Sequence, residues 1–203
     1  MNDQSKVPER QIRALYDNTT IRVYQAFSPH IGESALANGR FTSPPFKLAR
    51  MTWIKPSFLW MMYRSGWGMK DANQRCILAI DISREGFEWA LSHSSLSHVD
   101  PDAVSRDQWH AMKSQSPVRV QWDPERDLAL NPLAHRSIQV GLSGIAVQQY
   151  VSDWTMTISN VSSLAQQIHQ LVENGRIEEA ATLCPVERPY PLSDGLRARL
   201  AAS

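Results

Sequence analysis

Hydrophobic and polar residues alternate along several short stretches of the chain, which predicts β-strands. In residues 21–27 the odd-numbered positions form one face and the even-numbered positions form the other. Residues 77–82 are almost continuously apolar, which predicts a central strand buried on both faces. A further strand is expected at residues 118–122 and is predicted to end at Asp123-Pro124. Two more strands are expected at residues 137–142 and 154–158.

Apolar residues spaced three or four apart predict helices between and after these strands. The first expected helix begins at Ser28-Pro29 and ends at Gly39, and the second follows Ser83. A third is expected over residues 101–112, and a fourth begins at Ser143-Gly144. Two more are expected over residues 164–172 and 177–183. Residues 1–10 are expected to form a loose tail, and the segment with Pro185, Pro189 and Pro191 is expected to be extended. The pattern therefore predicts an α+β fold: one domain over residues 11–203, with a mixed or antiparallel central sheet and flanking helices.

Residues 51–68 are unusual because three tryptophans lie there among basic residues. Pro56 is suited to the first position of a helix, because its φ is fixed and its missing N–H costs nothing there. At about 100° per residue, one arc of that helix is expected to enter the core and to carry Phe58, Leu59, Met62 and Tyr63. The other arc is expected to carry Ser57, Trp60 and Arg64 near the helix N-terminus, where anions are favoured.

The chemistry that this segment favours is the binding of a charged molecule with a flat ring. Arginine forks bind phosphate, and stacking on an aromatic face is worth about 1–3 kcal/mol. The basic residues are Arg40, Lys47, Arg50, Lys55 and Arg64, and the aromatic residues are Trp53, Trp60, Tyr63 and Trp67. The same pattern also fits tryptophans that fill a core below solvated cations, or a simple surface stack of Trp60 on Arg64.

Composition narrows the function classes. A net charge of +1 disfavours nucleic-acid binding by bulk electrostatics, although a local basic patch is compatible with it. Two distant cysteines and dispersed histidines predict no disulfide scaffold and no metal site. Asp123, Glu125 and Asp127 are more typical of an acidic surface turn than of a cation site. The polar N-terminus and the short apolar runs predict a cytoplasmic protein without a membrane span.

Five segments resemble the domain-of-unknown-function family 4291. They are VYQAFSP (23–29), RMTWIKPSFLWMMYRSGWG (50–68), REGFEWAL (84–91), VQWDPERD (120–127) and RSIQVGL (136–142). Together they extend over most of the chain, and the second segment is long and distinctive. The chain is therefore identified as a member of that family.

A weaker resemblance is to the ADP-ribosyltransferase-like fold, in which an early strand, a middle segment and a late strand surround NAD. That resemblance implies roles for Arg22 and Tyr24 in the early strand and for Thr52, Ser57 and Tyr63 in the middle segment. In the late strand it implies Gln139, where the fold usually has Glu. A neutral amide can orient a hydroxyl but cannot stabilise a developing cation as a carboxylate does.

Three hypotheses follow for the function. The first is an NAD-binding transferase with Gln139, Tyr24 and Ser57 as catalytic residues and no metal. Its cofactor-binding residues are Arg22, Thr52, Lys55, Trp60, Arg64 and Arg136, and its three regions converge on one cavity. The second is a non-catalytic module for a nucleotide or single-stranded nucleic acid, which needs no Gln139. The third is a protein-interaction domain anchored by the tryptophans.

Gly141 is expected to let a ligand approach the backbone beside Gln139. The oligomeric state is left open.

Overall fold

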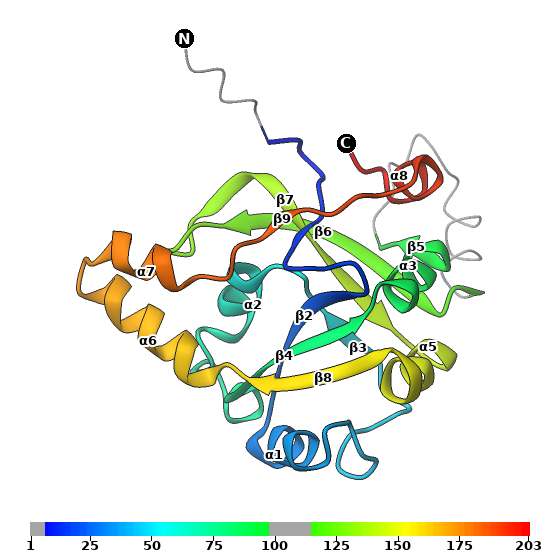
Figure 1. Cartoon of the computed structure of the whole chain (residues 1–203), viewed down its shortest axis with the longest axis horizontal. Coiled ribbons are helices and arrows are strands. Elements are labelled where there is room, and N and C mark those ends of the chain that lie inside the picture. Colours follow the sequence, from blue (N-terminus) through cyan, green and yellow to red (C-terminus); the bar gives the residue numbers. More distant parts are fainter. Residues whose placement is uncertain (1–6, 98–114) are drawn as a thin grey trace.

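The computed structural model describes residues 7–97 and 115–203, and these form an α+β fold as the sequence predicted. Figure 1 shows helices arranged around two principal sheets, with a short strand pair near the chain termini. That pair joins β1 (Arg13–Ala14) to β9 (Arg188–Pro189). The helix expected at residues 101–112 lies outside the described residues.

The first sheet is antiparallel, with the order β2-β4-β8. Its strands are β2 (Thr20–Phe27), β4 (Cys76–Ser83) and β8 (Thr155–Asn160). The predicted central position of residues 77–82 is confirmed, because β4 lies between the other two strands. Its two faces enter different cores, since Leu78 and Ile80 belong to one buried cluster and Ile77 and Ala79 belong to another.

The second sheet has the order β3-β7-β6-β5, with β5 parallel to β6 and the other pairs antiparallel. Its strands are β3 (Thr52–Ile54), β7 (Pro132–Leu142), β6 (Val118–Arg126) and β5 (Ser94–Leu96). The expected end at Asp123-Pro124 is wrong. The strand tolerates Pro124 because the register against β7 shifts between Pro124 and Arg126. Strand β6 therefore continues to Arg126.

The two sheets meet where β2 passes the end of β3. Tyr24 N donates to Lys55 O at 2.7 Å, and Lys55 N donates to Tyr24 O at 3.3 Å. One residue further along β2, the sheets are joined by a side chain instead. The Gln25 amide nitrogen donates to Thr52 Oγ1 at 2.6 Å and to Trp53 O at 3.1 Å. A cavity lies at this junction.

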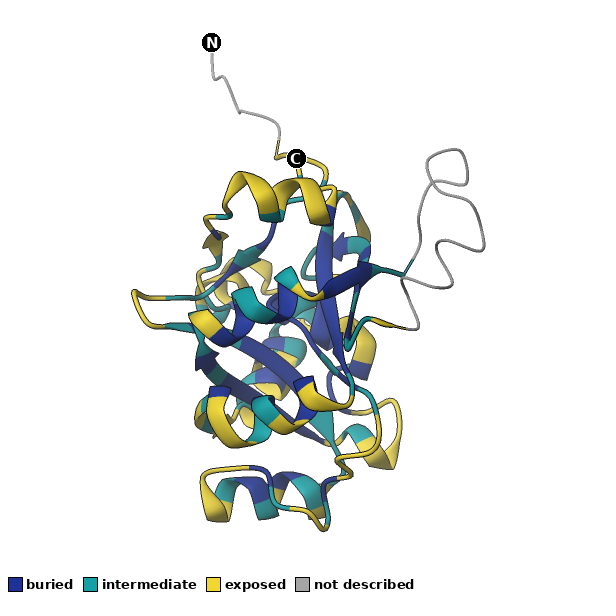
Figure 2. Ribbon diagram, turned by 90° about the vertical axis from the view of Figure 1, so that its right-hand side faces the viewer, coloured by how far each residue is buried: buried dark blue, intermediate teal, exposed yellow. Residues whose placement is uncertain are grey.

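The helices cover the outer faces of the sheets, and Figure 2 shows buried strands inside with exposed residues on the outer helical turns. The longer ones are α1 (Pro29–Asn38), α2 (Phe58–Ser65), α3 (Arg84–Ser92) and α6 (Ser162–Glu173), and the shorter ones are α5 (Ile145–Gln149), α7 (Ile177–Leu183) and α8 (Asp194–Leu200). A 3₁₀ turn η1 (Ala72–Gln74) and a π-helical turn η2 (Tyr150–Trp154) complete the elements. Two predicted helix boundaries are confirmed. Gly39 ends α1 with φ 63°. Ser83 caps the start of α3, where its Oγ accepts from Gly86 N at 3.2 Å.

The two ends of the chain differ from the sequence expectation. The C-terminal segment is extended only as far as residue 192, because Ser193 caps α8 by accepting from Leu196 N at 3.4 Å. Residues 1–6 of the expected loose tail lie outside the described part. Glu9 and Arg10 contact β7, and Arg136 N donates to Glu9 O at 2.7 Å. The domain boundary at residue 10 stays a prediction.

Candidate functional site: two adjoining basic cavities

Helix α2 begins two residues later than the proline signal suggests. Ser57 is its N-cap, so Pro56 precedes the helix. Ser57 Oγ accepts from Trp60 N at 3.1 Å and donates to Glu125 Oε1 at 3.0 Å. Burial raises the pKa of Glu125 above its ordinary value. Because both capacities of the hydroxyl are used in a buried site, Ser57 is held as a structural cap.

The C-terminal segment supplies a second carboxylate at the start of α2. Glu187 Oε1 accepts from Phe58 N at 2.7 Å, so one of the free amides of the helix start is satisfied. Burial of Glu187 raises its pKa to about 8, and the repulsion from Glu125 acts in the same direction. The N-terminus of α2 is therefore occupied by carboxyl groups of the protein itself and offers no place for an external anion.

The two faces of α2 differ from the expected arcs. Phe58 and Met62 are buried as predicted, whereas Tyr63 is 38% exposed and stacks on Trp60 with ring centroids 5.2 Å apart. The cation at this stack is Arg126 from β6, whose Cζ lies 3.6 Å from the Tyr63 ring centre. Arg126 Cζ also lies 5.6 Å from the Trp60 ring centre, so the cation at Trp60 is Arg126 and not the Arg64 of the alternative surface stack.

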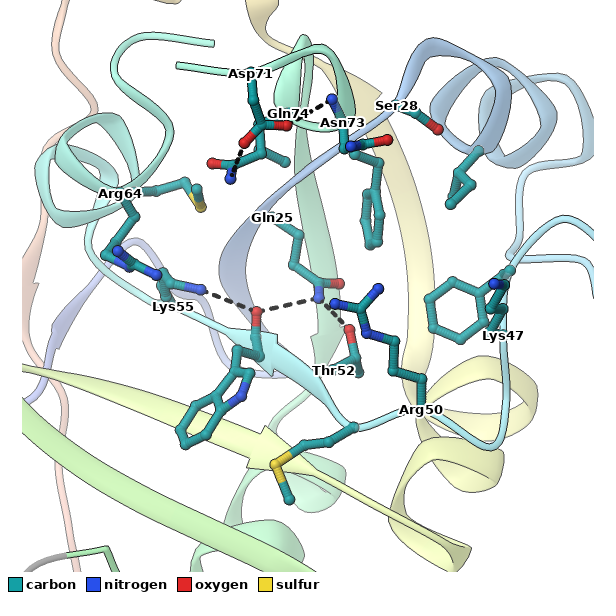
Figure 3. Close-up of a pocket in the computed structure, with 17 residues that line it drawn as sticks. Gln25, Ser28, Lys47, Arg50, Thr52, Lys55, Arg64, Asp71, Asn73 and Gln74 are labelled. Carbon is teal, nitrogen blue, oxygen red and sulfur yellow. Dashed lines mark hydrogen bonds between the residues drawn. The ribbon is translucent and has the colours of Figure 1, made fainter. Parts of the chain in front are cut away.

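The larger cavity has a volume of about 620 Å³ and lies beside the junction of β2 and β3 (Figure 3). Four of its ten polar lining residues are cations, and Asp71 is its one acidic residue among those described. The cations are Lys47, Arg50, Lys55 and Arg64. Within the described residues none of the four forms an ion pair. Figure 3 shows the guanidinium of Arg50 turned toward the middle of the cavity.

Gln25 forms part of the cavity wall and was missed by the sequence analysis. Its amide oxygen accepts from Tyr150 Oη at 2.7 Å, while its amide nitrogen donates to Thr52 Oγ1 and Trp53 O. Gln25 is only 4% exposed. A polar residue on the otherwise apolar face with Ile21 was the available signal, because a buried amide needs partners on other elements.

Lys55 is the most unusual cation of the site, because it is only 6% exposed. Its Nζ donates to Trp53 O at 3.2 Å. Burial lowers the pKa of Lys55 to about 7, the positive charge of Arg64 acts in the same direction, and Asp123 opposes both. Lys55 is thus poised between its charged and neutral forms near neutral pH.

A second cavity of about 570 Å³ adjoins the first, with Trp53, Lys55 and Arg64 lining both. Its other lining residues come from α2, β6 and β7: Trp60, Tyr63, Gln121, Asp123, Pro124, Arg126 and Gln139. The buried Trp60 Nε1 has no hydrogen-bond partner in the described part of the chain. The two cavities lie side by side, with Lys55 and Arg64 at their shared wall.

Gln139 lies on the floor of this second cavity, where it holds an acid. Its Nε2 donates to Asp123 Oδ2 at 2.6 Å, and Gln121 Nε2 donates to Asp123 Oδ1 at 2.8 Å. The expected ligand approach at Gly141 is wrong, because the Trp53 indole occupies that space. A Cβ added to Gly141 would lie 2.9 Å from the indole ring.

The prediction that the three regions converge on one cavity is right only in part. Thr52, Lys55 and Arg64 line the larger cavity, and Lys55, Arg64, Trp60 and Gln139 line the second. Four predicted residues line neither: Arg22, Tyr24, Ser57 and Arg136.

The reason lies in the alternation of β2. Gln25 faces the cavity, so Arg22 and Tyr24 point to the opposite face. Arg22 Nε pairs with Asp81 Oδ1 at 2.7 Å. Tyr24 packs on Phe58 with ring centroids 5.4 Å apart, and burial raises its pKa far above the ordinary value. Arg136 is engaged elsewhere, because it donates to Trp122 O at 3.2 Å.

The fold and site define an α+β protein with a pair of basic cavities beside the junction of two sheets. The family model described as Domain of unknown function (DUF4291) matches residues 11–190, so the chain belongs to this family, as the sequence predicted. A search of curated proteins found no match. None of the described helices is both long enough and apolar enough to cross a membrane.

Proposed function

We propose that this protein binds a nucleotide-like anion in the larger cavity, with phosphate groups held by Arg50, Lys55 and Arg64. The carrying observation is the set of four cations on one cavity, none of them ion-paired within the described residues. Like charges gathered around one space repel, and a bound anion relieves that repulsion. Arginine forks are suited to phosphate oxygens, and a buried lysine adds a point charge.

The size and lining of the cavity support a ligand with a ring. A volume of about 620 Å³ lies within the usual range for small-molecule sites, roughly 300–1,000 Å³. Phe27, Phe46 and Trp53 line it beside the cations. An aromatic lining favours a flat base or nicotinamide ring by about 1–3 kcal/mol when the ring stacks. Mononucleotides and NAD share these two requirements.

The proposal concerns binding and includes no transfer reaction. The transferase hypothesis requires Gln139, Tyr24 and Ser57 to surround one ribose. Gln139 lines the second cavity, whereas Tyr24 is core and Ser57 is a helix cap. Since these three side chains face different spaces, binding of a nucleotide-like anion is the function that the geometry supports best.

The test is calorimetric titration with ADP, NAD and pyrophosphate at two salt concentrations. Binding is expected to weaken as salt rises, because exposed Arg50 and Arg64 contribute through screened charges. The variant Arg50→Ala combined with Arg64→Ala is expected to lose binding. Arg40→Ala is the matched control, since Arg40 is exposed and lines neither cavity. Absence of binding by all three ligands, or equal loss in the control, would overturn the proposal.

A further inference from the structure

The second cavity contains an acid whose partners are surprising. Three cations line the same space, namely Lys55, Arg64 and Arg126, yet Asp123 pairs with none of them in the described part of the chain. Each carboxylate oxygen of Asp123 accepts instead from a neutral amide, from Gln121 at 2.8 Å and from Gln139 at 2.6 Å. The carboxylate is therefore held in a fixed orientation while its charge stays uncompensated by direct contact.

The sheet fixes this arrangement. Gln121 on β6 and Gln139 on β7 are directly opposite each other in the antiparallel register. Asp123 follows Gln121 by two residues, so all three side chains lie on the same face of the sheet. Positions on adjacent strands are rigid relative to each other, which makes this group a preformed surface of the cavity.

Gln121, Asp123 and Gln139 present hydrogen-bond acceptors to the second cavity. The amide nitrogens of both glutamines already donate to Asp123, and no hydrogen bond of the described residues uses their Oε1 atoms. A carboxylate has about four lone-pair positions, of which the two glutamines use two. Two amide oxygens and the remaining carboxylate positions can therefore accept hydrogen bonds from a ligand.

The charges of the cavity select the kind of donor. An ammonium group would be repelled by Lys55, Arg64 and Arg126, and a phosphate group would be repelled by Asp123 itself. A neutral hydroxyl group avoids both repulsions and can donate to a carboxylate. The acceptor group is thus suited to sugar hydroxyls that are attached to an anion bound at the shared wall.

The geometry points to the second cavity as a subsite for the vicinal hydroxyls of a phosphorylated sugar, with Asp123 as the acceptor that Gln121 and Gln139 orient. This inference rests on the proposed function, because it places the ribose of the same ligand beside phosphates held at Lys55 and Arg64. It implies that the protein distinguishes ribonucleotides from their deoxy analogues.

The experiment compares the affinities of ADP, 2′,3′-dideoxy-ADP and pyrophosphate for the full chain by calorimetry. ADP is expected to bind about tenfold tighter than the dideoxy analogue, the order of magnitude for one hydrogen bond to a charged group. In Asp123→Asn the ratio of these two affinities is expected to fall close to one. The ratio is informative because removal of a negative charge changes the binding of both anions equally.

Asp127→Asn is the matched control. Asp127 lies in the turn after β6, outside both cavities, and an asparagine oxygen there can still accept from Asn131 N, while the exposed bond from Asn131 Nδ2 is lost. That variant is expected to keep the tenfold ratio.

Equal affinities of the wild type for ADP and its dideoxy analogue, with pyrophosphate still binding, would overturn the inference and leave the proposed function standing. A ratio that Asp123→Asn does not change would also overturn it. Failure of all three ligands to bind would overturn the proposed function together with this inference.

Discussion

Lys55 and Arg64 stand at the wall shared by the two cavities, and the positive charge of Arg64 raises the electrostatic cost of charging Lys55. Burial contributes most to the lowered pKa of Lys55, about 7, and Arg64 adds to the effect. Two neighbouring cations that form no ion pair in the described part of the chain add no stability to the free protein. Their placement is understandable if an anion completes the site, and the first two predictions concern Lys55.

The first prediction concerns the pH dependence of ligand binding. Lys55 is protonated below about pH 7, so NAD is expected to bind about tenfold tighter at about pH 6 than at about pH 8.5. NAD is the appropriate probe because its pyrophosphate bridge, esterified at both ends, does not titrate in this interval. Lys55→Met is expected to flatten the profile, whereas Arg50→Ala should weaken binding and keep its pH dependence. A sloping profile that persists in Lys55→Met would assign the effect to another group.

The second prediction concerns stability. In the folded protein the pKa of Lys55 is about 7, below the ordinary value of 10.5. Between these values the unfolded chain binds more protons, so the Lys55 contribution to the free energy of unfolding increases as pH rises from about 7 to 10.5. Below about pH 7 both states are protonated and the full cost is present.

Chemical denaturation of wild type and Lys55→Met across this interval isolates the contribution of Lys55. The other titrating groups are common to both proteins, so their contributions cancel in the difference. We expect the advantage of the variant to shrink steadily toward high pH. A difference that stays constant from about pH 7 to 10 would mean that Lys55 titrates normally in the folded protein.

The third prediction tests Ser57 as a helix cap. Ser57→Ala removes the bonds to Trp60 N and Glu125 Oε1, and is expected to destabilise the fold by about 1–2 kcal/mol. Ser28→Ala is the control, because Ser28 occupies the N-cap of α1 without a side-chain cap bond and should cost less. Both unfolding free energies can be measured in urea. Normal stability of Ser57→Ala with abolished NAD binding would contradict the structural role and show that Ser57 acts on the ligand.

The fourth prediction concerns the contact between Gly141 and Trp53. Gly141→Ala places a methyl group 2.9 Å from the indole, inside van der Waals contact, and is expected to cost about 1–3 kcal/mol. Gly195→Ala in α8 meets no atom within 4 Å and is expected to be neutral or slightly stabilising, because alanine favours helix. Thermal unfolding and tryptophan fluorescence would report the difference. Equal melting temperatures for the two variants would show that the indole moves away freely.

Local signals predicted those parts of the fold that depend on neighbours in sequence. Alternation located β2 and β4, and the end signals at Gly39 and Ser83 are governed by one turn of backbone. The same kind of signal was available at Ser193, which caps α8, but the prolines before it suggested an extended segment. Strands β3 and β5 have three residues each, too few for a periodic pattern.

The site was harder to predict because its contacts join distant positions. The basic and aromatic residues between 47 and 64 did identify the region. However, the cation near Trp60 is Arg126, and the acid beside Gln139 is Asp123, both from β6. Neither partner can be found from spacing, since the register between β6 and β7 determines it. Arg22 and Tyr24 were assigned by analogy with another fold, and strand alternation turns both away from the cavities.

The three bonds of Gln25 have a consequence for the thermodynamics of ligand capture. One amide holds β2, β3 and the tyrosine of η2 together before any ligand arrives. That part of the cavity wall has little freedom left to lose, so the entropic cost of complex formation falls mainly on the exposed arginines at the rim. Stiffening Arg50 or Arg64 would tighten the complex, whereas stiffening the wall at Gln25 would change it little.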